Sequence, residues 1–189
     1  PDALWFGAGL VRVAGGGVGV QGESEDGAAL WTTEELSAEP VWQTHMFPSE
    51  ARIAGAPEGL WVAVDSVRDE EGADGSGALW LLPWDAVGEP LDEPTLWGPP
   101  GEEGFGSALG ATAGGMVVGS DDGGVFRIGE AGAALIGRVE GSVAALGSSG
   151  EVLLVGVPDQ DLAMGLPGDV EWRGPAGSWF GASLLVVGG

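Results

Sequence analysis

The stretch Gly104-Phe105-Gly106-Ser107-Ala108-Leu109, followed after a glycine-rich loop by Met116-Val117-Val118-Gly119-Ser120, decides how the rest of the chain is interpreted. Its Phe-Gly-small-small-Leu pattern occurs again as Phe6-Gly7-Ala8-Gly9-Leu10 and as Phe180-Gly181-Ala182-Ser183-Leu184. A pattern that returns along a chain indicates that one structural unit has been used several times. We therefore expect a repeat architecture.

The spacing of the copies indicates the size of the unit. The interval from Phe6 to Phe105, and that from Phe105 to Phe180, is each close to twice a unit of roughly 40 to 50 residues, the length of a propeller blade. Two weaker copies occur between them, Ile53-Ala54-Gly55-Ala56 and Val143-Ala144-Ala145-Leu146-Gly147. The sequence predicts one domain over residues 1–189, with units at about residues 6–52, 53–104, 105–142 and 143–179, and the start of a fifth at residues 180–189.

Short valine-rich runs bounded by glycine favour strands over helices in every unit. The predicted second strands are Val18-Gly19-Val20, Leu60-Trp61-Val62-Ala63-Val64, Met116-Val117-Val118 and Val152-Leu153-Leu154-Val155. The predicted third strands carry an aromatic residue after a glycine: Gly27-Ala28-Ala29-Leu30-Trp31, Gly77-Ala78-Leu79-Trp80, Gly124-Val125-Phe126 and Gly168-Asp169-Val170-Glu171-Trp172. Fourth strands are predicted at Glu39-Pro40-Val41-Trp42, Glu93-Pro94-Thr95-Leu96-Trp97 and Ala134-Leu135-Ile136-Gly137. We expect the matched aromatic residues to pack between sheets.

The composition agrees with an all-β chain. A length of 189 residues with 44% apolar residues is enough to build a core. The 38 glycines lack the period of collagen and therefore suit many tight turns between short strands. The sequence thus predicts an all-β fold, a β-propeller of four to five compact blades that is either complete or a part of a larger propeller.

The formal charge of −23 limits the classes of partner. It results from 29 acidic residues and six arginines, without any lysine. Such a field repels phosphate backbones and anionic membranes and attracts cations and basic partners. Nucleic acid is therefore excluded as a partner, whereas cationic partners and divalent ions are favoured. The same charge would also serve to keep a glycine- and valine-rich surface soluble.

Other absences bear on location and origin. The chain has no run of about 18 apolar residues, which predicts that nothing spans a membrane. It begins at Pro1 without a leader, as expected for a trimmed product. The absence of Lys, Asn, Tyr and Cys is typical of a GC-rich bacterial genome, and an engineered sequence would fit equally. Without cysteine, disulfides, thiolate catalysis and cysteine-ligated zinc are excluded.

The repeat resembles a known family. Phe105-Gly106-Ser107-Ala108-Leu109 with Val117-Val118-Gly119-Ser120 is similar to the Phe-Gly opening and the Val-Gly-Ala-Pro end of FG-GAP repeats, the blades of integrin-α-like propellers. Val155-Gly156-Val157-Pro158 is similar to that end, and Phe6-Gly7 and Phe180-Gly181 match the opening alone. The resemblance implies a propeller with a role in cell adhesion or other extracellular binding.

The calcium loops of that family are not matched. Family blades often hold Ca²⁺ in an Asp-x-Asp-x-Asp-Gly loop between the first two strands, whereas Gly110-Ala111-Thr112-Ala113-Gly114-Gly115 and Gly147-Ser148-Ser149-Gly150 contain no carboxylate. Carboxylates gather instead after the second strands, at Glu23, Glu25 and Asp26, at Asp65, Asp69, Glu70, Glu71 and Asp74, at Asp121 and Asp122, and at Asp159 and Asp161. The densest group, Asp69, Glu70, Glu71 and Asp74, is the candidate calcium site. A solvated acidic turn is the alternative interpretation of the same residues.

Two further candidates concern catalysis and ligand stacking. A carboxylate pair could hydrolyse a polysaccharide, but nothing selects two acids among so many. A Ser-His-Asp arrangement would have to use His45, the only histidine, and the chain has no nucleophile-elbow motif. Among the tryptophans, Trp84 follows Pro83 in a long connection and is the candidate for an exposed, ligand-binding role.

We therefore expect a non-catalytic interaction module, extracellular or on the cell surface, that binds a protein or a carbohydrate through its loops, with no certain cofactor beyond a candidate calcium ion. The alternatives are a polysaccharide-directed enzyme with a carboxylate pair, and a purely structural propeller fragment. The match of Trp5-Phe6 to Trp179-Phe180 favours a chain that is completed by further chains or by missing segments.

Overall fold

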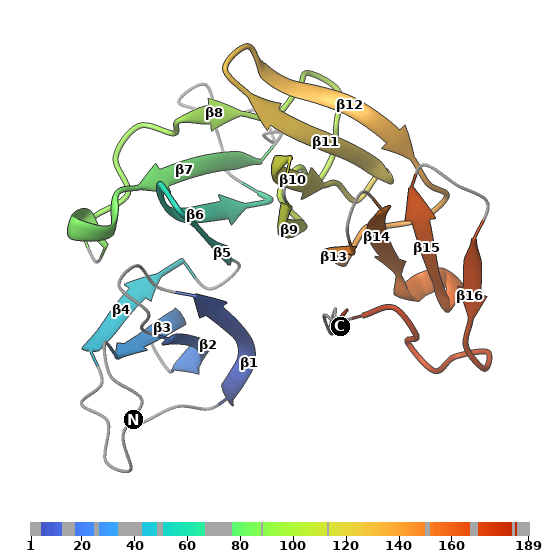
Figure 1. Ribbon diagram of the computed structural model, residues 1–189, viewed down its shortest axis with the longest axis horizontal. Helices are drawn as coiled ribbons and strands as arrows, with labels where there is room; N and C mark the ends of the chain where they lie inside the picture. Colours follow the sequence, from blue (N-terminus) through green and yellow to red (C-terminus); the bar gives the residue numbers. More distant parts are fainter. Residues whose placement is uncertain are drawn as a thin grey trace. The chain divides into compact units, whose positions relative to one another are not determined.

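Four antiparallel sheets make up the structure, a computed structural model (Figure 1). It describes residues 5–12, 18–24, 27–33, 43–48, 51–66, 77–87, 89–112, 114–149, 152–166, 170–182 and 184. Each sheet has four strands that follow one another both along the chain and across the sheet. The prediction of an all-β fold is confirmed. In the described part of the chain, no helix has the length and the apolar character needed to cross a membrane.

The strands of the first two sheets are β1 (Trp5–Arg12), β2 (Val18–Ser24), β3 (Gly27–Thr33), β4 (Gln43–Phe47), β5 (Arg52–Ala56), β6 (Gly59–Val64), β7 (Ala78–Leu82) and β8 (Leu96–Trp97). Those of the third and fourth sheets are β9 (Ala108–Thr112), β10 (Gly115–Gly119), β11 (Gly124–Gly129), β12 (Gly132–Arg138), β13 (Ala145–Ser149), β14 (Val152–Val157), β15 (Leu162–Leu166) and β16 (Glu171–Arg173). Two single-turn 3₁₀ helices, η2 (Trp84–Ala86) and η3 (Pro158–Gln160), interrupt the connections.

The chain divides into two compact units. The first comprises Pro1–Val62 and Trp80–Thr95, and the second comprises Ala63–Leu79 and Leu96–Gly189. The division passes through β6 and β7, so the second sheet contributes to both units.

In the first unit, two hydrogen bonds anchor the long connection that follows β7. The indole N–H of Trp80 donates to the carbonyl of Asp92 at 2.9 Å, and the N–H of Leu81 donates to the hydroxyl of Thr95 at 2.9 Å. Leu60 and Val62 of β6 are fully buried in the core. Burial of a tryptophan ring is favourable when its N–H has such a partner, so the connection is held against the strand that precedes it.

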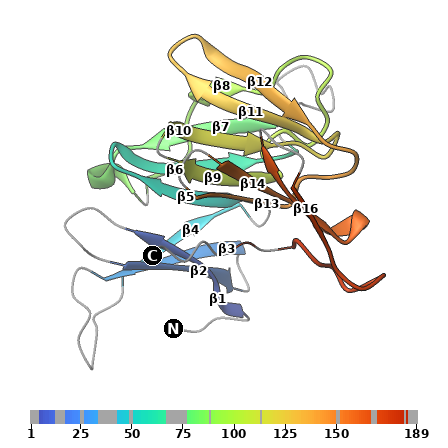
Figure 2. The ribbon, with the colours of Figure 1, turned by 45° about the vertical axis from the view of Figure 1, so that its right-hand side comes forward.

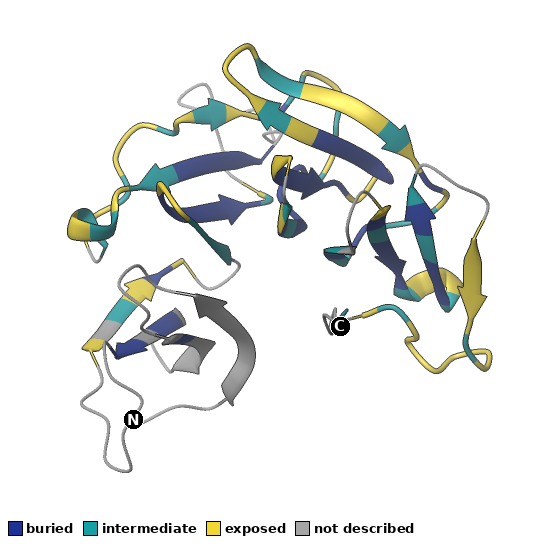
Figure 3. Cartoon of the chain, in the orientation of Figure 1, coloured by how far each residue is buried: buried dark blue, intermediate teal, exposed yellow. Residues whose placement is uncertain are grey.

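In the second unit, the third and fourth sheets share one hydrophobic core. Its buried members are Ala108, Val117, Val125, Val139, Val143, Leu146, Leu153, Val155, Val157 and Leu162, and they come from both sheets and from the connection between them. The first strands of these sheets, β9 and β13, lie side by side (Figures 1 and 2). Burial decreases across the third sheet, from the buried strand β10 to the largely exposed outer strand β12 (Figure 3).

The structure confirms most of the predicted strands and corrects one. The predicted second strands lie in β2, β6, β10 and β14. In the fourth sheet, however, the third strand is β15, and Trp172 belongs to the outer strand β16, where its side chain is exposed. The outer strand of the first sheet is β4, just after the predicted residues 39–42, which lie outside the described residues. The prediction that matched aromatic residues pack in the core is confirmed for Trp80 and Phe126 and is wrong for Trp172; the side chain of Trp31 is not among those described.

Candidate functional site: the acidic edge of the third and fourth sheets

Antiparallel register brings several acidic connections to one edge of the third sheet. Ala108 at the start of β9 pairs with Gly119 at the end of β10, and Gly124 at the start of β11 pairs with Arg138 at the end of β12. The connection that precedes β9, the β10–β11 turn and the β12–β13 connection therefore lie at the same edge. The fourth sheet repeats this arrangement with its β14–β15 turn and with the connection that follows β16.

We call the carboxylates at these positions the acidic edge. Its members are Glu102, Glu103, Asp121, Asp122, Glu140, Asp159 and Asp161. Most of their side chains are exposed, whereas Glu102 and Asp161 are partly covered. The β11–β12 hairpin, at the opposite end of the third sheet, carries Glu130. The acidic edge therefore concentrates negative charge at one end of two neighbouring sheets, a distribution that attracts cations.

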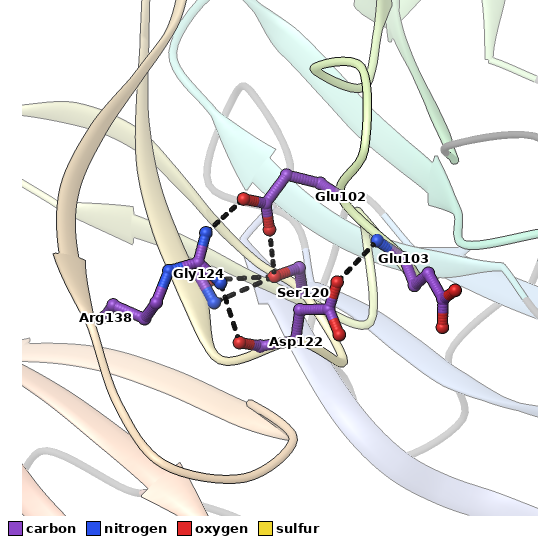
Figure 4. A network of polar contacts seen from close by, with 6 residues as sticks. All are labelled: Glu102, Glu103, Ser120, Asp122, Gly124 and Arg138. Carbon is purple, nitrogen blue, oxygen red and sulfur yellow. Dashed lines mark hydrogen bonds and ion pairs between the residues drawn. The ribbon is translucent and has the colours of Figure 1, made fainter.

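Arg138 is the cation at the centre of this edge (Figure 4). Its guanidinium forms an ion pair with Glu102 and also donates to the carbonyl of Asp122 at 2.8 Å. The other carboxylate oxygen of Glu102 accepts from the hydroxyl of Ser120 at 3.1 Å, and that hydroxyl oxygen accepts from the N–H of Gly124 at 2.8 Å. The network thus fixes the β10–β11 turn against the end of β12 and the connection that precedes β9.

A second set of polar contacts joins the two sheets at this edge. The hydroxyl of Ser142, in the β12–β13 connection, donates to Asp121 at 2.6 Å, and its N–H donates to Asp159 at 3.4 Å. The buried hydroxyl of Ser107 donates to the carbonyl of Val143 at 2.8 Å. The bond from Ser142 to the carboxylate of Asp121 is charge-assisted, and such hydrogen bonds are stronger than neutral ones. Hydrogen bonds therefore connect the part of the acidic edge on the third sheet with the part on the fourth.

Asp161 organises the connection that follows β16. Its carboxylate accepts hydrogen bonds from the N–H groups of Gly177 and Phe180 and from the hydroxyl of Ser178. Partial desolvation acts to raise the pKa of Asp161, but these hydrogen bonds, with one from the N–H of Trp179, outweigh it, and the pKa lies below its ordinary value. The residue itself adopts a left-handed backbone conformation with φ of 49°, which aspartate tolerates better than most residues.

Two places were considered for a calcium ion, the acidic group at residues 69–74 and the β9–β10 hairpin. Asp69, Glu70, Glu71 and Asp74 lie outside the described residues, so calcium binding there stays a prediction. The β9–β10 hairpin, where FG-GAP repeats often hold calcium, is closed by the hydroxyl of Thr112, which donates to the carbonyl of Gly115 at 2.8 Å. With no carboxylate in that turn, its residues do not fit a calcium ion. Among the described residues, no group of three or more His, Asp or Glu is arranged to hold a metal ion.

The other two candidate side chains both have local partners. Trp84 lies in η2, is partly buried, and donates its indole N–H to the carbonyl of Ala56 at 3.2 Å. The ring is thus fixed, and its ligand-binding role stays a prediction. His45 lies in β4 with its Nε2 atom 3.0 Å from the hydroxyl of Thr32, and burial lowers its pKa. These contacts agree with a locally packed histidine.

Sequence reasoning missed Arg138 and Ser142, which connect the acidic edge. Their partners are distant along the chain, and no motif marks either residue. The sequence does contain a signal for the segments that lead into this edge. Two of the Phe-Gly copies, at Phe105 and Phe180, follow similar stretches: Trp97-Gly98-Pro99-Pro100-Gly101 and Trp172-Arg173-Gly174-Pro175-Ala176-Gly177. The structure places both stretches at the end of an outer strand, leading into the acidic edge.

Comparisons with known proteins assign no family to the chain. No family model matches it, and no curated protein matches it. A solved structure described as that of the computationally designed Ika4 protein is similar with a TM-score of 0.47 and 16% identity, over 87% of this chain and 88% of that chain.

Proposed function

We propose that this chain is a non-catalytic binding module of the β-propeller type, secreted or displayed on the cell surface, which recognises a cationic protein or glycan ligand through the acidic edge. The observation that carries the proposal is the gathering of carboxylates from several connections at one end of the third and fourth sheets.

The propeller part of the proposal is supported by the order of the strands. Four consecutive four-stranded sheets, each with its strands in chain order, are the expected pattern of propeller blades. The neighbouring first strands β9 and β13 and the shared core between their sheets suit blades that stack beside each other. The Phe-Gly pattern, similar to FG-GAP repeats, supports the same interpretation.

Binding is favoured over catalysis by what the carboxylates do. Asp121, Asp122, Asp159 and Asp161 each accept a hydrogen bond from a neighbouring connection and so shape the edge. A general acid or nucleophile would instead need a side chain held toward a substrate. Glu103 and Glu140 are exposed and supply charge that a cationic ligand can meet.

The test measures binding of the purified chain to arrays of glycans and of cationic, neutral and anionic peptides. The variant Glu103→Gln with Glu140→Gln removes two charges from the acidic edge, and the control Glu89→Gln with Glu130→Gln removes two exposed charges elsewhere. We expect cationic ligands to be retained, more weakly at high salt, with a several-fold loss of affinity in the first variant alone. Equal losses in both variants, or no retained ligand, would refute the proposal.

Calcium is tested separately, by calorimetric titration of the chain and of an Asp69→Asn, Glu70→Gln variant. If the acidic group at residues 69–74 holds the ion, the heat of binding is lost in the variant. If the titration shows no heat in either protein, the module acts without calcium.

A further inference from the structure

The outer strand of the third sheet, β12, has an unpaired edge. The strand order of the sheet ends at β12, and in the described part of the chain no strand pairs with it on the side away from β11. Three consecutive residues of β12 are exposed: Ala134, Leu135 with an exposed fraction of 54%, and Ile136 with 40% (Figure 3). The N–H and C=O groups along such an edge are a template for one more strand.

The register of the β11–β12 hairpin indicates which backbone groups face this edge. The two-residue loop of the hairpin closes on the pair Gly129 and Gly132. Along an antiparallel strand, the backbone groups of successive residues point alternately to one neighbour and to the other side. Counted from the closing pair, Gly132 and Ala134 direct their groups to β11. Ala133 and Leu135 therefore direct their N–H and C=O groups to the unpaired edge.

The features that usually protect an outer strand are missing from β12. Natural sheets protect their edges with short outer strands, charged side chains or proline. The outer strand β8 has 2 residues, and β16 has 3, of which Glu171 and Arg173 are charged. In contrast, β12 has 7 residues and carries no charge and no proline before Arg138, its last residue. An extended chain can therefore pair with β12.

A β-bulge limits the length of the pairing segment. The register shifts between Val125 and Phe126 of β11, which leaves Ile136 as an extra residue in β12. Such a bulge bends the strand and increases its twist. Regular pairing with an added strand therefore ends at Leu135, and the rest of β12 leads into the acidic edge.

Leu135 gives this segment an apolar contact. It pairs with Phe126, so the two side chains lie on the same face of the sheet. Phe126 is buried, whereas more than half of Leu135 is exposed. An apolar side chain of an added strand, placed opposite Leu135, would remove this exposed surface from water, which is favourable.

The charge near the end of β12 favours one kind of added strand. Arg138 forms an ion pair with Glu102, and the exposed Asp122 and Glu140 lie at the same end of the strand. A second copy of this chain would bring its own charge of −23 and be repelled. A peptide with basic side chains is attracted to the same place.

We propose that β12 binds an extended cationic peptide as an additional antiparallel strand. An apolar residue of the peptide lies opposite Leu135. Because β12 runs from the hairpin toward the acidic edge, the antiparallel peptide begins at that edge, and its basic residues lie in its N-terminal half. The inference rests on the proposed function, since the acidic edge supplies the attraction, and it adds the conformation and direction of the ligand.

The first experiment tests the direction of the peptide by fluorescence anisotropy with the full chain. The labelled peptide has capped ends, basic residues in its N-terminal half, and alternating valine and threonine in its C-terminal half. A second peptide has the same residues in reverse order, so its basic residues would lie at the hairpin end of β12. We expect the second peptide to bind several-fold more weakly. Equal affinities would overturn the assigned direction and with it the proposal.

The second experiment tests the backbone pairing. Two versions of the first peptide carry N-methyl groups on alternate backbone amides, in the two possible phases, and each methyl group removes one N–H donor. In an added strand, one phase faces β12 and the other faces solvent. We therefore expect one version to bind at least about tenfold more weakly and the other to change less than about threefold. If both versions bind as the parent peptide does, this inference is wrong, whereas binding by charge at the acidic edge is retained.

Variants of the chain test the surface itself. Leu135→Lys removes the apolar contact and repels a cationic peptide, and is expected to weaken binding at least about tenfold. Val170→Lys is the matched control, because Val170 is 53% exposed and lies before β16 in the fourth sheet; it is expected to change binding less than about threefold. Equal losses in the two variants would overturn the proposal.

A backbone variant gives an independent measurement. Ala133→Pro removes an N–H that faces the unpaired edge and leaves the pairing with β11 in place, so it is expected to fold and to bind several-fold more weakly. Circular dichroism of each variant confirms that the sheets are formed. Unchanged binding by Ala133→Pro would contradict the pairing.

Hydrogen exchange measured by NMR shows whether the edge is available in the free chain. We expect the amides of Ala133 and Leu135 to exchange rapidly in the free chain and slowly with the peptide, and that of Ala134 to exchange slowly in both. Slow exchange of all three in the free chain would mean that the chain itself covers the edge, which overturns the proposal. So does light scattering that shows a dimer of the free chain which Leu135→Lys dissociates. If no cationic peptide is retained, the proposed function and this inference are both wrong.

Discussion

Phe105 and Phe126 meet edge to face, with ring centroids 5.4 Å apart and an interplanar angle of 71°. The first residue belongs to the turn before β9, and the second lies two strands further on, in β11. Aromatic pairs in this geometry contribute beyond the area that they bury. The pair therefore fixes the Phe-Gly turn to the sheet that follows it.

Phe105→Ala is expected to lower the free energy of unfolding by about 3–5 kcal/mol, because the ring is fully buried and its removal leaves a cavity. Urea denaturation followed by tryptophan fluorescence measures the change. The matched control is Phe180→Ala, which alters the same motif where it is exposed, and which is expected to change the stability of the monomer by less than about 0.5 kcal/mol. If the two variants lost similar free energies of unfolding, the prediction that Phe105 but not Phe180 stabilises the core would be wrong.

Arg138→Gln is expected to destabilise the chain by about 1 kcal/mol, a value kept low because the guanidinium is partly exposed to solvent. The change removes the ion pair with Glu102 and the hydrogen bond to the carbonyl of Asp122. Chemical denaturation at low salt gives the size of the effect. Arg127→Gln, which removes the same charge from an exposed position on β11, is expected to cost less than about 0.5 kcal/mol. If both variants lost the same stability, the loss would come from removing a positive charge and not from breaking the contacts of Arg138.

Gly123→Ala is expected to destabilise the chain by about 2–5 kcal/mol, from the left-handed backbone and from overpacking together. Gly123 has φ of 78°, and an added Cβ would lie 2.1 Å from the carbonyl oxygen of Val139. Gly101→Ala is the control, because Gly101 has φ of 82° but open space around the added atom, and about 1–2 kcal/mol is expected from the backbone alone. Thermal denaturation of both variants compares them, and a smaller loss at Gly123 would contradict the close approach.

The strands were predictable where the local pattern was complete. The valine-rich runs that became β6 and β10 are short, apolar and bounded by glycine, and this combination favours a buried strand over a helix. The strand β15 was not found, because Leu162-Ala163-Met164-Gly165-Leu166 has no aromatic residue and the search for one led to Trp172 in β16. The partly buried Met164 takes the place in β15 that a ring takes in β7 and β11, and the sequence of one unit does not reveal such an exchange.

The acidic edge was predictable only as clusters of charge. Asp121, Asp122, Asp159 and Asp161 were recognised because each pair follows a second strand. The contact of Ser142 with both Asp121 and Asp159 depends on two sheets that lie beside each other, and that placement is set by their shared apolar core. Local sequence patterns therefore predict where the acidic residues lie, whereas the packing of the two sheets determines which of them are connected by hydrogen bonds.

Asp161 makes the connection after β16 sensitive to acid. Its pKa is lower in the folded chain than the ordinary value of 3.8, so the folded chain binds fewer protons than the unfolded chain in this range. The stabilisation from the carboxylate is therefore complete above pH 3.8 and is lost as the pH falls through the lower folded value. Asp161→Asn is expected to be less stable than the wild type at neutral pH, with a difference that shrinks to nothing in strong acid.

The titration itself is followed by NMR of the Asp161 carboxyl carbon. Ser178→Ala removes one of the donors to that carboxylate and is expected to move the pKa of Asp161 back toward its ordinary value. Because both the Asn and the Ala change leave the left-handed backbone of residue 161 accessible, the comparison isolates the hydrogen bonds. The prediction is wrong if the stability difference between wild type and Asp161→Asn is the same at neutral and at strongly acidic pH. In that case the carboxylate charge does not stabilise the turn at residues 177–180. The backbone contacts of that turn would then hold it without Asp161.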